Sequence, residues 1–197
     1  MGDSNQVEWV RSLRDTIRGP VIEIGSRHYA PESSMDYRSI CQGLEFIGVD
    51  MSSDTNVDVV VDMTQDFAEV DRALGARRFR TLICCSVLEH VPNVFAMAAN
   101  MTRLTAPEGV LFLSVPFVWR YHGYPKDYWR FTPDAVEVLF PEFEFDPNRS
   151  SLSSNVAKDV HAFSRNPNDF VVRPVVDGSN PYLLAPNLLN MFGVKRS

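Results

Sequence analysis

The stretch Pro20-Val21-Ile22-Glu23-Ile24-Gly25-Ser26-Arg27 decides the fold that we expect for this chain. Its β-branched apolar residues, interrupted by one acid and closed by a glycine, are typical of a buried parallel strand that breaks into a ligand-binding loop. We therefore predict a strand over residues 20–24 and a functional turn at Gly25, with the rest of the chain arranged around this turn.

The segments on both sides of this stretch alternate between strand and helix patterns. Further strands are predicted over residues 44–49, 57–61, 80–86 and 110–115. Helical spacing of apolar residues predicts helices over 6–18, 35–42, 65–76, 93–105 and 132–139. This alternation predicts an α/β fold of the Rossmann-like, doubly wound kind, a mostly parallel sheet with helices on both faces. No repeat or linker divides the chain, so we expect a single domain over residues 1–197 with its core in 20–140.

The second half of the chain has a different character. Seven aromatic residues fall within 117–131, and we expect this segment to form a lid over a substrate pocket. Within it we assign Phe117, Trp129 and Phe131 to the core, and Trp119, Tyr121 and Tyr124 to the pocket. Residues 146–187 give the weakest pattern, an insert or late strands. We expect polar loops at 150–155 and 166–169, and strands at 171–172 and 188–194.

The composition excludes several classes of protein. With 197 residues and a net charge of -6, the chain lacks the broad basic face that grips nucleic acid. No apolar run reaches the ~20 residues of a membrane span, and the first residues do not resemble a signal peptide. The three cysteines form neither a disulfide framework nor a metal-ligand spacing. We expect buried free thiols, no metal site, no membrane partner and a cytoplasmic location.

Candidate site residues follow from topology. Ligands of open parallel sheets bind beyond the carboxyl ends of the strands, where the strand order reverses. The predicted ends carry Gly25, Asp50, Asp62 and the run 86–90. Gly25 lets a backbone approach a ligand closely, Asp50 has the spacing of an acid that binds a ribose diol, and Asp62 with the following methionine lies where a purine rim would be held.

Each of these residues also has a purely structural interpretation. Gly25 is also consistent with an ordinary turn glycine, and Asp50 with a loop acid or helix cap. Asp62 is also consistent with a solvated loop acid. Glu23 lies inside a strand, where a carboxylate must be paired or hydrogen-bonded. It either orders the glycine loop and faces a ligand, or is an internal anchor. Arg27 either contacts a ligand carboxylate or lies in solvent.

Taken together, several segments resemble the class I S-adenosylmethionine-dependent methyltransferase family. The matching pieces are Val21-Ile22-Glu23-Ile24-Gly25, Gly48-Val49-Asp50, Val61-Asp62-Met63, Ser86-Val87-Leu88-Glu89-His90-Val91-Pro92 and Pro107-Glu108-Gly109-Val110-Leu111. The segment 122–133, His-Gly-Tyr-Pro-Lys-Asp-Tyr-Trp-Arg-Phe-Thr-Pro, is similar to a motif of one branch whose members resemble small-molecule or glycan methyltransferases. The family's first loop has further glycines, whereas Ser26, Arg27 and His28 follow Gly25 here.

The resemblance implies a seven-stranded sheet whose last strand, near 188–194, is antiparallel. It implies S-adenosylmethionine as cofactor. Glu23 and Gly25 would lie by its methionine part, Asp50 by the ribose, and Asp62 with Met63 by the adenine. The full set expected to bind the cofactor is Glu23, Gly25, Ser26, Arg27, Asp50, Met51, Asp62, Met63 and Ser86.

The chemistry implied is transfer of a methyl group to a small-molecule acceptor, such as a hydroxyl of a sugar or natural product. An oxygen acceptor needs a base within about 3 Å or through a water. His122 is the first candidate, His90 the second, and Asp127 would orient or assist. Both histidines are also consistent with structural hydrogen bonding in loops.

Two other functions remain open from the sequence. A nicotinamide-dependent dehydrogenase would need a G-x-G-x-x-G turn after the first strand, and residues 26–30 provide none. A non-catalytic protein that binds an adenosyl ligand or a partner is compatible with the altered glycine loop. Failure of methyl transfer despite cofactor binding would distinguish it from the enzyme.

Overall fold

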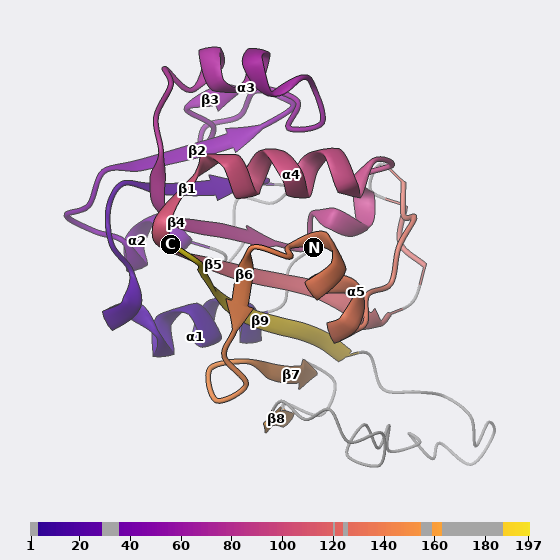
Figure 1. Ribbon diagram of the computed structural model, residues 1–197. Helices are drawn as coiled ribbons and strands as arrows, with labels where there is room; N and C mark the ends of the chain where they lie inside the picture. The colour runs from indigo at the N-terminus through magenta and orange to yellow at the C-terminus, as the bar shows by residue number, and fades with distance from the viewer. Residues whose placement is uncertain (1–3, 29–35, 120, 124–125, 155–158, 163–186) are drawn as a thin grey trace.

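The computed structural model describes residues 4–28, 36–119, 121–123, 126–154, 159–162 and 187–197. Its centre is a nine-stranded sheet in the order β3-β2-β1-β4-β5-β9-β7-β8, with β6 paired to β9 (Figure 1). The predicted Rossmann-like α/β class is confirmed, but the described sheet has nine strands where seven were expected.

The first five strands are parallel to one another. They are β1 (Val21–Ile24), β2 (Phe46–Asp50), β3 (Val59–Val60), β4 (Phe79–Cys85) and β5 (Thr105–Val118). The chain runs outward from β1 through β2 to β3 and then returns to β4 on the other side of β1. The strand order therefore reverses at β1, and the carboxyl ends of β1 to β4 lie along one edge of the sheet.

The late strands extend the sheet beyond β5. β9 (Asn187–Lys195) is antiparallel to β5, as predicted for residues 188–194. β6 (Phe143–Phe145) and β7 (Ser151–Ser154) both pair antiparallel with β9, and β8 (Asp159–Ala162) pairs with β7. The predictions for 166–169 and 171–172 lie outside the described residues.

The polar loop predicted over 150–155 is wrong, because β7 occupies Ser151–Ser154. The side chains of Ser151 and Ser153 are buried, and both hydroxyls accept hydrogen bonds from Asn190 Nδ2, at 3.1 and 3.0 Å. The buried serines of β7 thus have hydrogen-bond partners inside the protein. The sequence of this strand therefore lacks the alternation of apolar and polar residues by which a strand is recognised.

Helices cover both faces of the sheet. On one face α3 (Phe67–Ala73), α4 (Val94–Leu104) and α5 (Pro133–Leu139) bury residues in the larger apolar cluster (Figure 1). On the other face α1 (Ser4–Ser12) and α2 (Tyr37–Ile40) contribute to a second cluster. The helix predicted over 6–18 is instead α1 followed by a short 3₁₀ turn, η1 (Arg14–Thr16).

Two predicted helices are confirmed in detail. The apolar face expected on 93–105, which comprises Val94, Met97, Ala98, Met101 and Leu104, is buried along its whole length in α4. At the start of α5, Thr132 Oγ1 accepts a hydrogen bond from the Ala135 N–H at 3.2 Å, and Pro133 is the first helical residue.

The three cysteines, Cys41, Cys84 and Cys85, are buried free thiols as predicted. Among the described residues the longest helix is α4, with 11 residues, and no helix there is long and apolar enough to cross a bilayer.

Candidate active site

A cleft opens at the edge of the sheet where the strand order reverses. It encloses about 820 Å³, including the part open to solvent. Seven predicted site residues line it: Gly25, Asp50, Met51, Asp62, Met63, Ser86 and His90. The others are Ile24, Val49, Val61, Thr64, Val87, Val91 and Met97. The strand-end rule therefore locates most of this cleft.

Gly25 forms the turn at the end of β1. Its φ is +80°, and its N–H donates to the Val49 carbonyl at 2.8 Å. A β-carbon at this position would lie 2.3 Å from Val87 Cγ2. Both the backbone conformation and the contact with the loop after β4 therefore require glycine.

Asp50 and Asp62 are held at the ends of β2 and β3 by short turns. Asp50 Oδ1 accepts a hydrogen bond from the Ser52 N–H at 3.0 Å. Asp62 Oδ1 accepts from the N–H and the hydroxyl of Thr64, both at 2.8 Å. Each carboxylate is thereby fixed through one oxygen, and the described part of the chain makes no hydrogen bond to the other. Acceptors fixed in this way at a cleft suit ligand hydroxyl and amino groups.

Asn100 on α4 supports the wall of the cleft and was not identified from the sequence. Its buried side chain donates to the carbonyls of Met63 and Gln65, at 2.9 and 2.8 Å. It ties α4 to the loop that carries Asp62 and Met63. An asparagine between apolar helix positions is the sequence signal that could have indicated this buried polar contact.

Ser86 has a positive φ of +56° at the end of β4, and its N–H donates to the Ser114 carbonyl at 2.8 Å. Its hydroxyl accepts a hydrogen bond from Gln6 Nε2 at 2.9 Å, and Gln6 Nε2 also donates to Ser114 Oγ at 2.7 Å. Gln6 comes from α1, so a residue distant in the sequence fixes the floor of the cleft. Nothing in the sequence identified this contact.

Glu23, Ser26 and Arg27 do not line the cleft. Because side chains alternate along a strand, Glu23 faces away from Ile24, toward α2. Burial raises the pKa of Glu23 to about 8, which the charge of Arg38 opposes only in part. Ser26 is buried, and its carbonyl accepts from Asn56 Nδ2 at 2.9 Å. Arg27 Nε lies 3.6 Å from Asp54 Oδ2.

A second, smaller hollow adjoins the cleft, and Ser86 borders both. Its other lining residues are Glu89, Pro116, Trp119, His122 and Leu188, which pack so closely that the hollow has no room for a water molecule. Beside it, possible ligand atoms of Glu89, His90 and His122 lie within 4.8 Å of one another. The structure thus brings both predicted histidines together at the end of the cleft.

Asp127 lies directly behind His122. His122 Nδ1 is 3.0 Å from Asp127 Oδ2, and the His122 backbone N–H donates to the same oxygen at 2.8 Å. Arg130 donates to both carboxylate oxygens, at 2.5 and 2.7 Å. These hydrogen bonds hold the pKa of Asp127 well below its usual range, so the carboxylate is ionised and fixed against the imidazole.

His90 and Glu89 lie on the 3₁₀ turn η2 (Leu88–His90), which follows β4. His90 Nδ1 lies 2.6 Å from the Lys126 carbonyl, and burial lowers the pKa of His90. Glu89 has an exposed fraction of 1%, and burial raises its pKa to about 7. The group therefore combines two imidazoles with a carboxylate that is almost fully removed from water.

The aromatic segment 117–131 is divided between core, hollow and surface. Phe131 is buried and Phe117 packs against the larger cluster, as expected, and Trp119 lines the smaller hollow. The core assignment of Trp129 is wrong: it is 40% exposed, and its indole N–H donates to the Val91 carbonyl at 2.8 Å. Tyr121 is 77% exposed and lines neither space, and Tyr124 lies outside the described residues.

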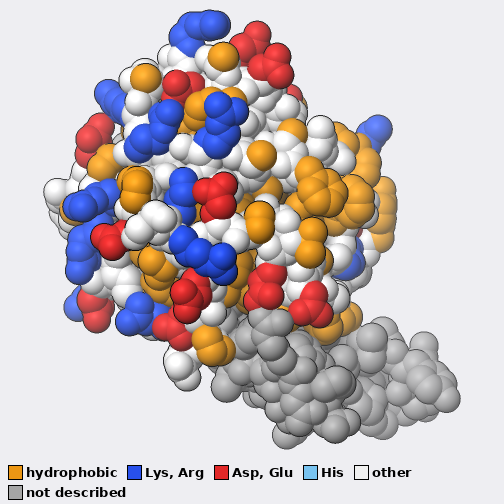
Figure 2. All heavy atoms as spheres, in the orientation of Figure 1, with side chains coloured by type: hydrophobic (Ala, Val, Ile, Leu, Met, Phe, Trp, Pro, Cys, Tyr) orange, Lys and Arg blue, Asp and Glu red, His pale blue; other side chains and the backbone are white. Residues whose placement is uncertain are grey.

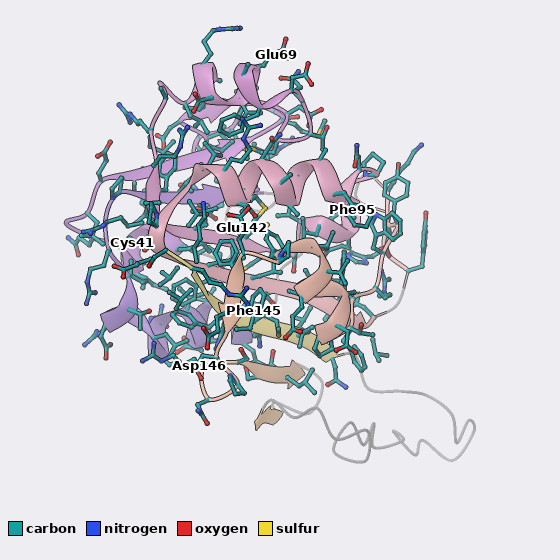
Figure 3. All side chains as sticks on the ribbon, in the orientation of Figure 1. Cys41, Glu69, Phe95, Glu142, Phe145 and Asp146 are labelled. Carbon is teal, nitrogen blue, oxygen red and sulfur yellow. The ribbon has the colours of Figure 1, made fainter. Side chains whose placement is uncertain are left out.

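Exposed aromatic residues gather near the start of α4. Figure 2 shows a group of hydrophobic side chains on this side of the molecule, and Figure 3 labels Phe95 there. Tyr128 and Trp129 are tied to the same region, because the Tyr128 N–H donates to the Glu89 carbonyl at 2.7 Å and Trp129 bonds Val91. The segment 126–131 is thereby anchored against η2 through its backbone and one indole.

No protein-family profile matches the sequence, and no curated protein matches it. Solved structures do match the fold. A SAM-dependent methyltransferase from Archaeoglobus fulgidus superposes with a TM-score of 0.62 at 15% identity, covering 98% of this chain and 93% of that one. The N-methyltransferase NodS from Bradyrhizobium japonicum, in complex with S-adenosylhomocysteine, gives 0.59 at 10% identity, covering 98% and 87%.

A third similar structure is 1,6-didemethyltoxoflavin-N1-methyltransferase from Burkholderia thailandensis, which holds 1,6-didemethyltoxoflavin and S-adenosylhomocysteine. Its TM-score is 0.53 at 15% identity, and the match covers 98% of this chain and 77% of that one. At these identities the likeness concerns the backbone. The chain therefore has the Rossmann-like fold of SAM-dependent methyltransferase structures.

Proposed function

We propose that the protein is a methyltransferase that uses S-adenosylmethionine to methylate a small molecule, at a hydroxyl of a sugar or natural product. The observation that carries this proposal is the cleft at the reversal of strand order, where Gly25, Asp50 and Asp62 converge next to the hollow that His122 lines. The fold that the chain shares with structures holding S-adenosylhomocysteine supports the same cofactor.

The residues of the cleft fit the parts of this cofactor. Asp50 would accept hydrogen bonds from the ribose hydroxyls through its second carboxylate oxygen. Asp62 and Met63 would flank the adenine, with Met51 at the outer rim, where it is 67% exposed. Gly25 and Ser86 would let the methionine part approach the backbone at the ends of β1 and β4. Glu23, Ser26 and Arg27 would act from behind, by supporting the glycine turn.

The cofactor supplies an electrophilic methyl group on a sulfonium, so the protein's main task is to align donor and acceptor. Such alignment can lower the activation barrier by about 7–11 kcal/mol. The acceptor hydroxyl would lie at the Ser86 end of the cleft, and the side chains around the adjoining hollow would move apart to bring it to His122. His122 would accept its proton as the methyl–oxygen bond forms. Asp127 would keep the proton of the neutral imidazole on Nδ1, which leaves the Nε2 lone pair as the base. His90 is the second candidate for this role.

Charge and composition support a small acceptor in the cytoplasm. The net charge of -6 opposes a nucleic-acid substrate. The three buried free thiols suit a reducing compartment.

Calorimetry with S-adenosylmethionine, S-adenosylhomocysteine and NAD tests this function. We expect micromolar binding of both adenosyl ligands, no binding of NAD, and loss of binding in Asp50→Ala. Asp66→Ala is the matched control, because Asp66 is exposed and makes no side-chain cap bond at the start of α3. Absence of binding to either adenosyl ligand would refute the proposal. Binding without transfer to any acceptor would identify a non-catalytic adenosyl-binding protein.

A further inference from the structure

We propose that Glu89, His90 and His122 form a binding site for one divalent transition-metal ion. A carboxylate oxygen and two ring nitrogens from these residues lie within 4.8 Å of one another. Glu89 and His90 come from η2, and His122 comes from the segment after β5. The fold assembles the three ligands from distant parts of the chain, which is why sequence spacing predicted no metal site.

The hydrogen bonds behind both histidines put them in the tautomer that binds metals. His90 Nδ1 faces the Lys126 carbonyl, and a carbonyl can only accept, so this nitrogen carries the proton. His122 Nδ1 lies 3.0 Å from Asp127 Oδ2, and Arg130 donates to both oxygens of that carboxylate, so Asp127 likewise only accepts. In each neutral ring Nε2 therefore carries the lone pair. A ring nitrogen held by a carboxylate or a backbone carbonyl is the usual support of a metal-binding histidine.

Glu89 supplies the negative charge and the reason that a cation is needed. Its side chain is buried, and Oε2 has no hydrogen-bond partner among the described residues. Oε1 lies 3.8 Å from His90 Nε2. The guanidinium of Arg130 is directed at Asp127 through two hydrogen bonds. A buried carboxylate with an oxygen that receives no hydrogen bond is unfavourable unless a proton or a metal ion lies beside it.

Two imidazoles and one carboxylate suit Zn²⁺, Fe²⁺ or Mn²⁺, and three protein ligands leave a coordination position open. Bonds of about 2.0–2.2 Å would draw the three side chains together by on the order of 1 Å. The adjoining hollow between Ser86 and Trp119 lies beside that position, and an acceptor oxygen would reach it only as these side chains move apart. One consequence of a metal here rests on the proposed function. An acceptor hydroxyl bound to the metal would lose its proton more readily, and His122 Nε2, as a metal ligand, would then not serve as the base.

Metal titration of the tag-free, chelator-treated protein tests the site. Co²⁺ is followed by its visible absorption and Zn²⁺ by calorimetry at pH 7.5. We expect one equivalent of each to bind. Glu89→Gln and His90→Gln should weaken binding at least about 100-fold, and Asp127→Asn about 10–100-fold through His122. Glu69→Gln, an exposed change on α3 (Figure 3), should bind as the wild type does.

Absence of Co²⁺ absorption and Zn²⁺ heat, or wild-type affinity in both Glu89→Gln and His90→Gln, would overturn the proposal and leave a proton in place of the metal. Binding of S-adenosylhomocysteine, measured on every sample, shows that the cleft is folded. It also separates the two proposals: a protein that binds S-adenosylhomocysteine and no metal retains the proposed function and lacks this site.

Discussion

Gly25 and Val87 are in such close contact that a β-carbon on Gly25 would lie 2.3 Å from Val87 Cγ2. The turn after β1 and the loop after β4 thus meet without space for a side chain, and both line the cleft in which we propose that the cofactor binds. This contact links the geometry of the glycine turn to that of the segment leading to Glu89 and His90.

We expect Gly25→Ala to destabilise the protein through two separable effects. The positive φ costs about 1–2 kcal/mol for a residue with a β-carbon, and the collision with Val87 adds about 1–3 kcal/mol. Urea unfolding of Gly25→Ala, Val87→Ala and the double variant measures both. The collision should appear as a favourable coupling in the double variant. Strictly additive changes in the free energy of unfolding would show that the loops move apart freely.

Asn100→Leu should lower both stability and cofactor affinity. The substitution leaves the carbonyls of Met63 and Gln65 without their partner, at a cost of about 1–3 kcal/mol. It also releases the loop that carries Asp62 from α4. We expect a lower urea midpoint and weaker S-adenosylhomocysteine binding by calorimetry. Thr102→Val is the matched control, since it removes only a hydroxyl bonded to Ala98 within the same helix. Equal affinity in the two variants would mean that Asn100 does not position the cleft.

His122→Ala should reduce turnover at least about 100-fold while leaving S-adenosylmethionine binding intact, because the variant lacks the base that accepts the proton of the acceptor hydroxyl. Asp127→Asn should lower kcat with little change in KM, since it disturbs the imidazole and not the acceptor. S-adenosylhomocysteine release over a panel of glycosides and phenols is the assay. Near-normal turnover of His122→Ala would remove this residue from the mechanism.

The two proposed roles of His122, base and metal ligand, both predict a loss of turnover in His122→Ala, and treatment with a chelator distinguishes these roles. If His122 is the base in a metal-free protein, dialysis against EDTA leaves turnover unchanged. If His122 is a metal ligand, EDTA abolishes turnover and Zn²⁺ or Mn²⁺ restores it. Asp66→Asn, an exposed change, serves as the control in both measurements.

The part of the fold that the sequence predicted is the part whose packing is periodic. β1 and β4 are mostly apolar runs between helices, and α4 has an apolar face, so their positions follow from hydrophobic spacing. Asp50 and Asp62 were found because parallel strands end at a common edge. The same logic failed for β7, whose buried serines are satisfied by Asn190 on β9.

The unpredicted part of the site depends on long-range polar contacts. Gln6 reaches Ser86 and Ser114 from α1, although glutamine in an amphipathic helix ordinarily faces solvent. Glu23 was expected either to order the glycine loop and face a ligand or to be an internal anchor, and its register places it on the face opposite Ile24. Local sequence contains neither the register nor the distant partner. Such residues become recognisable only when the strands are aligned.

Glu23 should make the stability of the protein fall as pH rises. Its pKa is about 8 in the folded protein, against 4.5 for an ordinary glutamate. Between these values the folded state holds a proton that the unfolded state has released, so the free energy of unfolding decreases with increasing pH. The stabilising contribution is complete below about pH 4.5 and lost above about pH 8. Its size is roughly 3–5 kcal/mol, since one pKa unit corresponds to about 1.4 kcal/mol.

Glu23→Gln carries a neutral side chain of the same shape and removes this dependence. We expect wild type and variant to unfold at similar urea concentrations near pH 5, and the variant to be the more stable at pH 8. Glu89, whose pKa burial raises to about 7, adds a smaller loss in the same direction to both proteins. Glu69→Gln, on the exposed face of α3, should run parallel to the wild type. If the Glu23→Gln curve also runs parallel to the wild type, Glu23 is ionised in the folded protein and must be paired with a cation such as Arg38.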